Sequence, residues 1–155
     1  AVALLEARGF KAEDFARSHP GGALGRKLLT HVSDVMRSGD AVPRVDPDAT
    51  FNELMKQISA KSVGATAIVS PTNHVLGIFT DGDLRRLIEK GFDLRQVSAK
   101  EVMHTSPRTI RVNELAAMAA EMMETHSITS ILVLDTDDKL CGIVHISDLM
   151  RAKVI

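Results

Sequence analysis

The chain has 155 residues, of which 45% are hydrophobic, and its 19 lysines and arginines nearly balance its 20 aspartates and glutamates. This length and composition predict one ordinary globular domain or two very small ones that share a core, and the balanced charge argues against nucleic-acid binding. No stretch approaches the roughly 18 consecutive apolar residues of a membrane span, and no charged leader precedes an apolar run, so we expect a soluble protein without membrane contact.

Residues 1–30 lie outside the regular pattern that fills the rest of the chain. Residues 1–8 are rich in Ala and Leu and predict helix. The run FARSHPGGALGRKLL follows at residues 15–29 and contains His19 before Pro-Gly-Gly. Proline fixes one backbone dihedral and glycine permits positive values, so this sequence can be simply a turn.

From residue 31 onward, one pattern is written twice. Val32–Met36 recurs 67 positions later as Ala99–Met103, and after a two-residue length difference the register becomes 65. In this second register, residues 62–65 match 127–130, residues 77–79 match 142–144, and residues 83–86 match 148–151. We therefore divide the chain into a domain end and linker at 1–30 and two repeats at 31–93 and 94–155.

An amphipathic helix is expected early in each copy. Apolar residues recur at i, i+3, i+4 and i+7 along residues 50–60, and the second copy repeats this spacing. The residues are Phe51, Leu54, Met55 and Ile58 in the first copy and Leu115, Met118, Ala119, Met122 and Met123 in the second.

A hairpin pattern follows in each copy. The apolar runs 67–69 and 131–134 end in turn residues, and a second apolar run comes after each turn. Cys141 lies in such a run, which indicates a buried strand rather than a reactive thiol. As the only cysteine it cannot form an internal disulfide, which fits a reducing cytoplasm.

Asp83 and Asp148 stand before Leu-rich segments, where a side-chain oxygen can cap the first free amides of a helix. Each copy therefore reads strand, helix, strand, turn, strand, helix. This predicts an α/β (α+β) fold of two β-α-β-β-α repeats packed as a pseudo-symmetric pair. A unit of about 60 residues buries little surface alone, so we expect the pair to be the folding unit.

The first copy ends in Gly77-x-x-Thr80-x-x-Asp83-Leu84. Together with the β-α-β-β-α order, this motif resembles the cystathionine-β-synthase (CBS) domain, which occurs as an intimate tandem pair. The resemblance covers about residues 31–155 and is strengthened by the recurrence in both copies. In that family, the hydroxyl and carboxylate between the third strand and second helix face a cleft between the copies, where nucleotides such as adenosine derivatives bind.

The resemblance implies a ligand cleft at Thr80 and Asp83. An Asp can accept two hydrogen bonds from neighbouring ribose hydroxyls, and a Thr hydroxyl with free amides at a helix start can hold a phosphate. Family geometry puts the opposite wall on the second copy, at Arg108, Thr109, Thr129 and Ser130. Arg108 could pair with a phosphate or a carboxylate.

The same symmetry implies a second cleft, formed by His145, Asp148, Arg44, Val45, Gly64 and Ala65. Here the sequence departs from the family pattern, because His145 replaces the hydroxyl residue. Histidine can donate a hydrogen bond, but it is larger and its charge depends on pH. We expect the cleft with Thr80 to bind better.

Other interpretations of these residues remain open. Asp83 and Asp148 can serve as helix caps alone, and Gly77 and Gly142 can be close-packing positions. The six histidines have no Cys partner and no i, i+4 pair, so we expect no metal site and no cofactor.

The run at residues 15–29 closely resembles the junction in arabinose-5-phosphate isomerases, where a sugar isomerase (SIS) domain passes into a CBS pair. Those enzymes interconvert ribulose 5-phosphate and arabinose 5-phosphate for the octulosonate sugar (Kdo) of lipopolysaccharide or capsule. The resemblance implies that His19 could act as a general acid or base in the parent. Without the parts that bind the sugar phosphate, this chain should not catalyse.

The leading hypothesis is a regulatory module that binds a nucleotide or nucleotide-sugar effector, such as an adenine nucleotide or CMP-Kdo, between the repeats. The effector would shift the packing of the copies and signal through residues 20–31. The alternative is a purely structural oligomerisation module of the same enzyme, and the two roles can coexist. With either role we expect a homodimer through CBS pairs and a higher homo-oligomer in the parent. A parent that regulates transcription is a third possibility, against which the junction argues.

Overall fold

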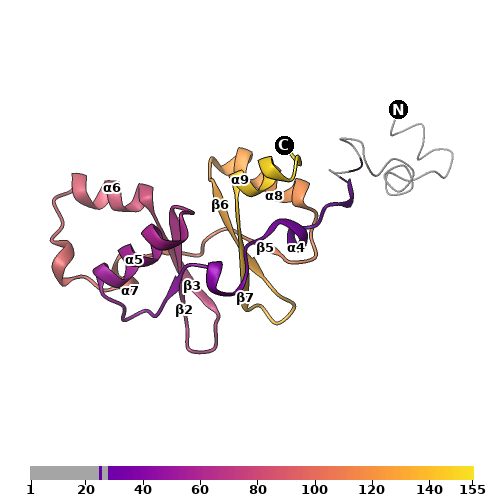
Figure 1. Cartoon of the computed structure of the whole chain (residues 1–155). Coiled ribbons are helices and arrows are strands. Elements are labelled where there is room, and N and C mark those ends of the chain that lie inside the picture. The colour runs from indigo at the N-terminus through magenta and orange to yellow at the C-terminus, as the bar shows by residue number, and fades with distance from the viewer. Residues whose placement is uncertain (1–24, 26–27) are drawn as a thin grey trace.

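Two similar halves make up the computed structural model, which describes Gly25 and residues 28–155 (Figure 1). The first repeat contains α4 (Val32–Val35), η1 (Gly39–Ala41), β1 (Arg44–Val45), α5 (Phe51–Lys61), β2 (Ala65–Val69), β3 (Val75–Thr80) and α6 (Asp81–Glu89). The second contains η2 (Leu94–Gln96), α7 (Ala99–Val102), β4 (His104–Thr105), β5 (Thr109–Arg111), α8 (Ala116–His126), β6 (Ser130–Leu134), β7 (Leu140–His145) and α9 (Ile146–Arg151). The expected α/β pair of β-α-β-β-α repeats is confirmed.

The two sheets have matching topology. One has the strand order β1-β2-β3-β4 and the other β5-β6-β7. In each, a short parallel strand pairs with the first arm of an antiparallel hairpin, and the register shifts once, at Ile68/Val69 and at Val133/Leu134. The expected hairpins are therefore both present.

The segment that leads into each repeat packs on the other repeat. Strand β4, from the start of the second repeat, pairs antiparallel with β3 of the first, with His104 opposite Ile78. Arg37 makes the equivalent bridge to Ile143 on β7. Helix α4 accordingly packs on α8 in one half, and α7 packs on β3 in the other. The sequential division at residues 93 and 94 therefore differs from the division into packed halves.

Buried side chains from both repeats meet in one cluster between the sheets. It combines Val42, Val63, Ala65, Ala67, Val69 and Ile78 with Leu132, Leu140 and Ile143. Each half also has a cluster under its own helices, and these contain the exchanged residues Val32 in one case and Ala99 in the other, both fully buried. The halves therefore share a core, as expected for a unit too small to be stable alone.

Gly77 and Gly142 are required by this exchange. A Cβ at Gly77 would lie 2.6 Å from Met103 Sδ and 2.8 Å from the His104 carbonyl oxygen. At Gly142 the neighbours are Met36 Sδ at 2.5 Å and the Arg37 carbonyl oxygen at 2.9 Å. The close-packing interpretation of both glycines agrees with these distances.

Helices α6 and α9 begin three residues earlier than the capping aspartates suggested. Thr80 and His145 are the N-caps, and Asp83 and Asp148 occupy the third helical position of a capping box. Each carboxylate accepts the backbone N–H of its N-cap residue, at 2.9 Å for Asp83 and 3.0 Å for Asp148. The position of the cap was wrong in our sequence interpretation, because the Asp reaches back to the N-cap instead of preceding the helix.

Candidate functional site

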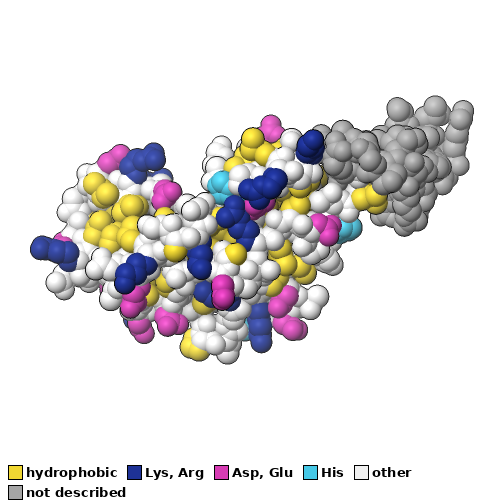
Figure 2. Space-filling view, viewed as in Figure 1, with side chains coloured by type: hydrophobic (Ala, Val, Ile, Leu, Met, Phe, Trp, Pro, Cys, Tyr) yellow, Lys and Arg dark blue, Asp and Glu magenta, His cyan; other side chains and the backbone are white. Residues whose placement is uncertain are grey.

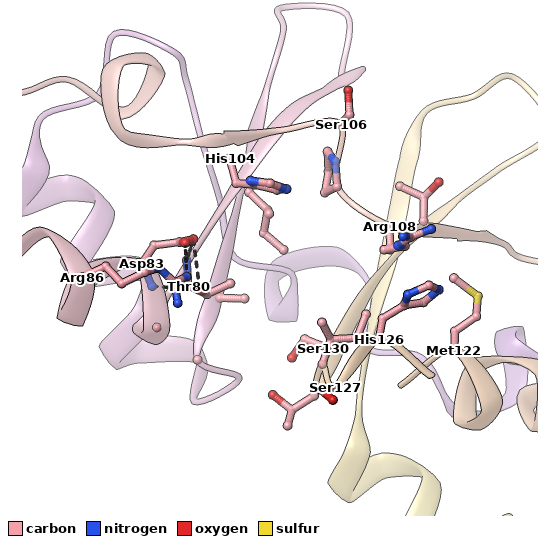
Figure 3. A pocket seen from close by; sticks show the side chains of 18 residues that line it. Thr80, Asp83, Arg86, His104, Ser106, Arg108, Met122, His126, Ser127 and Ser130 are labelled. Carbon is pink, nitrogen blue, oxygen red and sulfur yellow. Dashed lines mark hydrogen bonds and ion pairs between the residues drawn. The ribbon is translucent and has the colours of Figure 1, made fainter. Parts of the chain in front are cut away.

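A cavity of about 930 Å³ opens between the two halves. Its walls come from the end of β3 and the start of α6, from the segment 104–109, and from the end of α8 and the start of β6. Figure 3 shows Thr80, Asp83 and Arg86 on one side and Arg108 and His126 on the other. All six residues expected for the first cleft line this cavity: Thr80, Asp83, Arg108, Thr109, Thr129 and Ser130.

Asp83 is held in a fixed orientation. Its Oδ2 accepts hydrogen bonds from the Thr80 backbone N–H at 2.9 Å and from the Thr80 hydroxyl at 3.0 Å. The Arg86 guanidinium donates to Oδ1 at 2.6 Å. The Asp83 side chain is 19% exposed while that of Arg86 is 63% exposed, so the arginine is the solvent-exposed partner of this ion pair.

The opposite wall presents hydroxyl groups and a cation. No carboxylate of residues 28–155 lies within 4 Å of the Arg108 guanidinium. The Ser130 hydroxyl instead donates to the Val63 carbonyl oxygen across the halves, at 3.0 Å. Ser130 therefore joins the two walls. Arg108 lines the cavity without a carboxylate partner among residues 28–155.

Sequence reasoning missed several lining residues, which are Ile78, Gly82, Arg86, His104, Ser106, Pro107, Met122, His126, Ser127 and Ile128. The repeat register contained a signal for some of them, because His126 and Ser127 are the equivalents of Lys61 and Ser62 at the end of α5. Among the described lining residues, Asp83 is the only acid and faces two arginines and two histidines. The cavity is thus suited to an anionic ligand that also offers hydroxyl groups.

The six residues expected for the second cleft are not gathered in the same way. Gly64 and Ala65 line the first cavity, and the Arg44 guanidinium donates to Asn73 Oδ1 at the β2–β3 turn, at 3.0 Å. Val45 packs against the cluster under α5. The assignment of these four residues to a second cleft stays a prediction.

His145 and Asp148 do lie together. The His145 Nδ1 accepts the Ser147 backbone N–H at 3.1 Å, which makes the imidazole the cap of α9. Burial, followed by the nearby Arg37 charge, lowers the pKa of His145 from its ordinary value, against the opposing effect of Asp148. The Asp148 carboxylate is 5% exposed and accepts from Arg37 Nε at 3.1 Å. Sequence reasoning missed Arg37 entirely.

No group of three or more His, Cys, Asp or Glu side chains within the described part of the chain is arranged to hold a metal ion. In the same part, no helix combines the length and the apolar character needed to cross a bilayer. His19 falls among residues 1–24, outside the described residues.

The CBS domain family matches residues 32–90 and again residues 99–155. The chain belongs to the CBS domain family. The two matches correspond to the two repeats, so the protein contains a CBS pair, and the resemblance seen in the Gly-x-x-Thr-x-x-Asp motif is confirmed.

Curated relatives and solved structures agree with this assignment. The chain is 50% identical over all 155 residues to the arabinose 5-phosphate isomerase KdsD of Salmonella typhi, of which it covers 47%. The chain thus spans about half the length of this relative. Among solved structures, CBSX2 in complex with AMP superposes with a TM-score of 0.67 at 22% identity, covering 79% of this chain and 95% of CBSX2. The CBS pair of MJ0100, in complex with 5'-methylthioadenosine and S-adenosyl-L-methionine, has a TM-score of 0.69 at 20% identity, covering 79% of this chain and 94% of that pair.

Proposed function

We propose that this CBS pair binds an adenine nucleotide in the cavity at Thr80 and Asp83 and regulates an arabinose 5-phosphate isomerase of which it is part. The observation that carries the ligand assignment is a single lining carboxylate, Asp83, with Arg108 and His126 on the other side of the cavity (Figure 3). A nucleoside monophosphate offers the complementary groups, namely a ribose diol and a phosphate.

The ribose would be held by Asp83. The capping box fixes the carboxylate of Asp83 at the start of α6, so the Asp83 side chain loses no rotamer freedom when a ligand binds. Ribose hydroxyls would replace the Arg86 guanidinium at Oδ1. That exchange costs little because an exposed ion pair is worth about 0–1 kcal/mol.

The phosphate would lie near Arg108 and His126 on the opposite wall. The Arg108 guanidinium has no carboxylate partner among residues 28–155 and can pair with two phosphate oxygens at once. The basic lining favours an anion such as AMP over a cation such as S-adenosylmethionine, although CBS pairs have been solved with each. A nucleotide sugar such as CMP-Kdo has the same combination of diol and phosphate and is the second ligand to test.

The role in the parent rests on the 50% identity to KdsD over the whole chain. Bound between the halves, the effector would change their packing and act on the isomerase domain through residues 20–31. Coupling of this kind is typically worth about 1–3 kcal/mol, which changes an affinity about 5- to 150-fold. The pathway would be Kdo synthesis for lipopolysaccharide or capsule, in the cytoplasm.

Calorimetry on this chain tests the ligand assignment. We expect AMP to release or absorb heat with a saturable isotherm, adenosine to bind more weakly, and S-adenosylmethionine to bind more weakly still. Asp83→Asn should weaken AMP binding about tenfold or more, because a hydrogen bond to a charged group contributes about 1.5–3 kcal/mol.

Asp81→Asn is the matched control, since Asp81 belongs to the same first helical turn but is exposed and does not line the cavity. It should leave the AMP affinity unchanged. Absence of heat with AMP and with CMP-Kdo would contradict nucleotide sensing, and equal losses in both variants would indicate a general charge effect.

An oligomerisation role is favoured by one observation. Large apolar side chains are exposed on helices α6, α8 and α9 and on the segments that follow α6 and α9. They are Ile88, Phe92, Met118, Met150 and Ile155. Figure 2 shows apolar atoms at the surface of both halves. A homodimer through these faces would be compatible with sensing. Loss of assembly on deleting residues 31–155 of the parent, without any response to nucleotides, would favour the structural role alone.

A further inference from the structure

Arg37 and His104 occupy equivalent positions in the two halves. They are 67 residues apart, which is the register of the lead-in segments. Arg37 bridges to Ile143 and His104 pairs with Ile78, and these two isoleucines are themselves equivalent. Arg37 and His104 therefore each lie on an extended segment that pairs with the other repeat.

The Arg37 guanidinium bridges the two halves on its side. Its Nε donates to both oxygens of Asp148, at 3.1 and 3.3 Å, and Nη1 donates to the Lys61 carbonyl oxygen at 3.3 Å. Asp148 belongs to α9 of one half, and Lys61 ends α5 of the other. The Arg37 side chain is 25% exposed and Asp148 is 5% exposed, so the carboxylate is closed off from water.

The equivalent place in the first cleft is open. Asp83 corresponds to Asp148 and His126 to Lys61, and both line the cavity of about 930 Å³. His104 lines it as well, and no hydrogen bond joins its ring to Asp83 in the described chain. The Arg37 guanidinium thus lies beside Asp148, whereas the equivalent residue Asp83 lines a cavity of ligand size.

We propose that Arg37 is an internal occupant of the second cleft and restricts the CBS pair to one bound nucleotide. The inference deepens the proposed function and rests on it, since the ligand of the open cleft is the one proposed above. The guanidinium takes the carboxylate that would otherwise accept the ribose hydroxyls. Arg37, and not the replacement of a hydroxyl by His145, determines that this cleft does not bind.

Amide chemical shifts measured during a titration with AMP test the proposal on the whole chain. In the wild-type chain we expect shifts at residues 80–83 and none at residues 145–148. In Arg37→His, which copies the residue of the open cleft, we expect shifts at both places and a doubling of the bound AMP. Shifts at 145–148 in the wild-type chain, or their absence in a folded Arg37→His chain, would overturn the proposal.

The reciprocal variant, His104→Arg, gives a second test that does not leave a buried carboxylate without a partner. The new guanidinium should reach Asp83 and lower the AMP affinity of the first cleft at least tenfold. Thr105→Arg is the matched control, because it adds the same charge one residue away on an exposed side chain that does not line the cavity. Unchanged affinity in His104→Arg would count against the proposal.

Nucleotide binding at Asp83 and the role of Arg37 in the second cleft can be disproved independently. If AMP causes no shift at residues 80–83 of the wild-type chain, the proposed function is wrong, whereas shifts at 145–148 in Arg37→His would still support the occupant role. If Arg37→His does not fold, Arg37→Gln keeps a hydrogen-bond donor near Asp148 while shortening the side chain, and the same shifts decide.

Discussion

The imidazole of His145 begins helix α9 in place of the hydroxyl that begins α6. Its Nδ1 must be unprotonated to accept the Ser147 N–H, and burial together with Arg37 lowers the pKa of the ring. The unfolded chain therefore binds a proton more readily than the folded chain near pH 6.5, the ordinary value for histidine. This contribution to stability is fully present above that pH and is lost as the pH falls below it.

His145→Thr should remove this part of the pH dependence, because a threonine hydroxyl caps the helix at any pH, as Thr80 does in α6. The measurement is the free energy of unfolding in urea between pH 7.5 and 5 for both chains. The difference between variant and wild type should move in favour of the variant as the pH is lowered. A difference that stays constant over this range would show that His145 is not the group responsible.

The crossing strands β3 and β4 depend on one glycine. Gly77→Ala should reduce the free energy of unfolding by about 1–3 kcal/mol, because the added methyl group meets Met103 Sδ and a backbone oxygen inside 3 Å and the strands must separate. Chemical denaturation gives the value. Gly82→Ala is the control, since the nearest atom there lies at 3.5 Å; a similar loss in both variants would contradict the steric explanation.

The local elements were the predictable part of the structure. Apolar spacing located α5 and α8, and turn residues located both hairpins, because these features depend on neighbours within a few positions. The pattern Thr80-x-x-Asp83 also contained the capping box, which our interpretation displaced. The exchange of α4 and α7 between the halves could not be predicted, since pairings such as that of Arg37 with Ile143 join residues far apart in sequence and leave no periodic signal.

In the candidate site too, the residues of a local motif were predictable and a contact between residues far apart in sequence was not. Thr80 and Asp83 followed from a motif, the four residues of the opposite wall followed from the family geometry that the resemblance implied, and all six line one cavity. Their role in binding stays a prediction. Arg37 was not found because its importance lies in burial and in an ion pair with Asp148, 111 positions away. Only a three-dimensional structure could show that Arg37 bonds to Asp148 while Asp83 lines a cavity.

At the scale of the whole molecule, the shared core predicts a single cooperative unit. Leu54→Ala removes a fully buried side chain under α5 and should cost about 2–5 kcal/mol. Hydrogen exchange should then accelerate equally at β2 in one half and at β6 in the other. Asn52→Ala, on the exposed side of the same helix, should change neither. Unaltered protection of β6 in Leu54→Ala would mean that the halves unfold independently.

The position of α4 has a mechanical consequence for whatever is joined to the amino side of residue 28. That point of attachment is fastened to the half that supplies Arg108, while Asp83 belongs to the half across the cavity. A ligand that changes the packing of the halves, as proposed above, would therefore move this attachment point relative to Asp83.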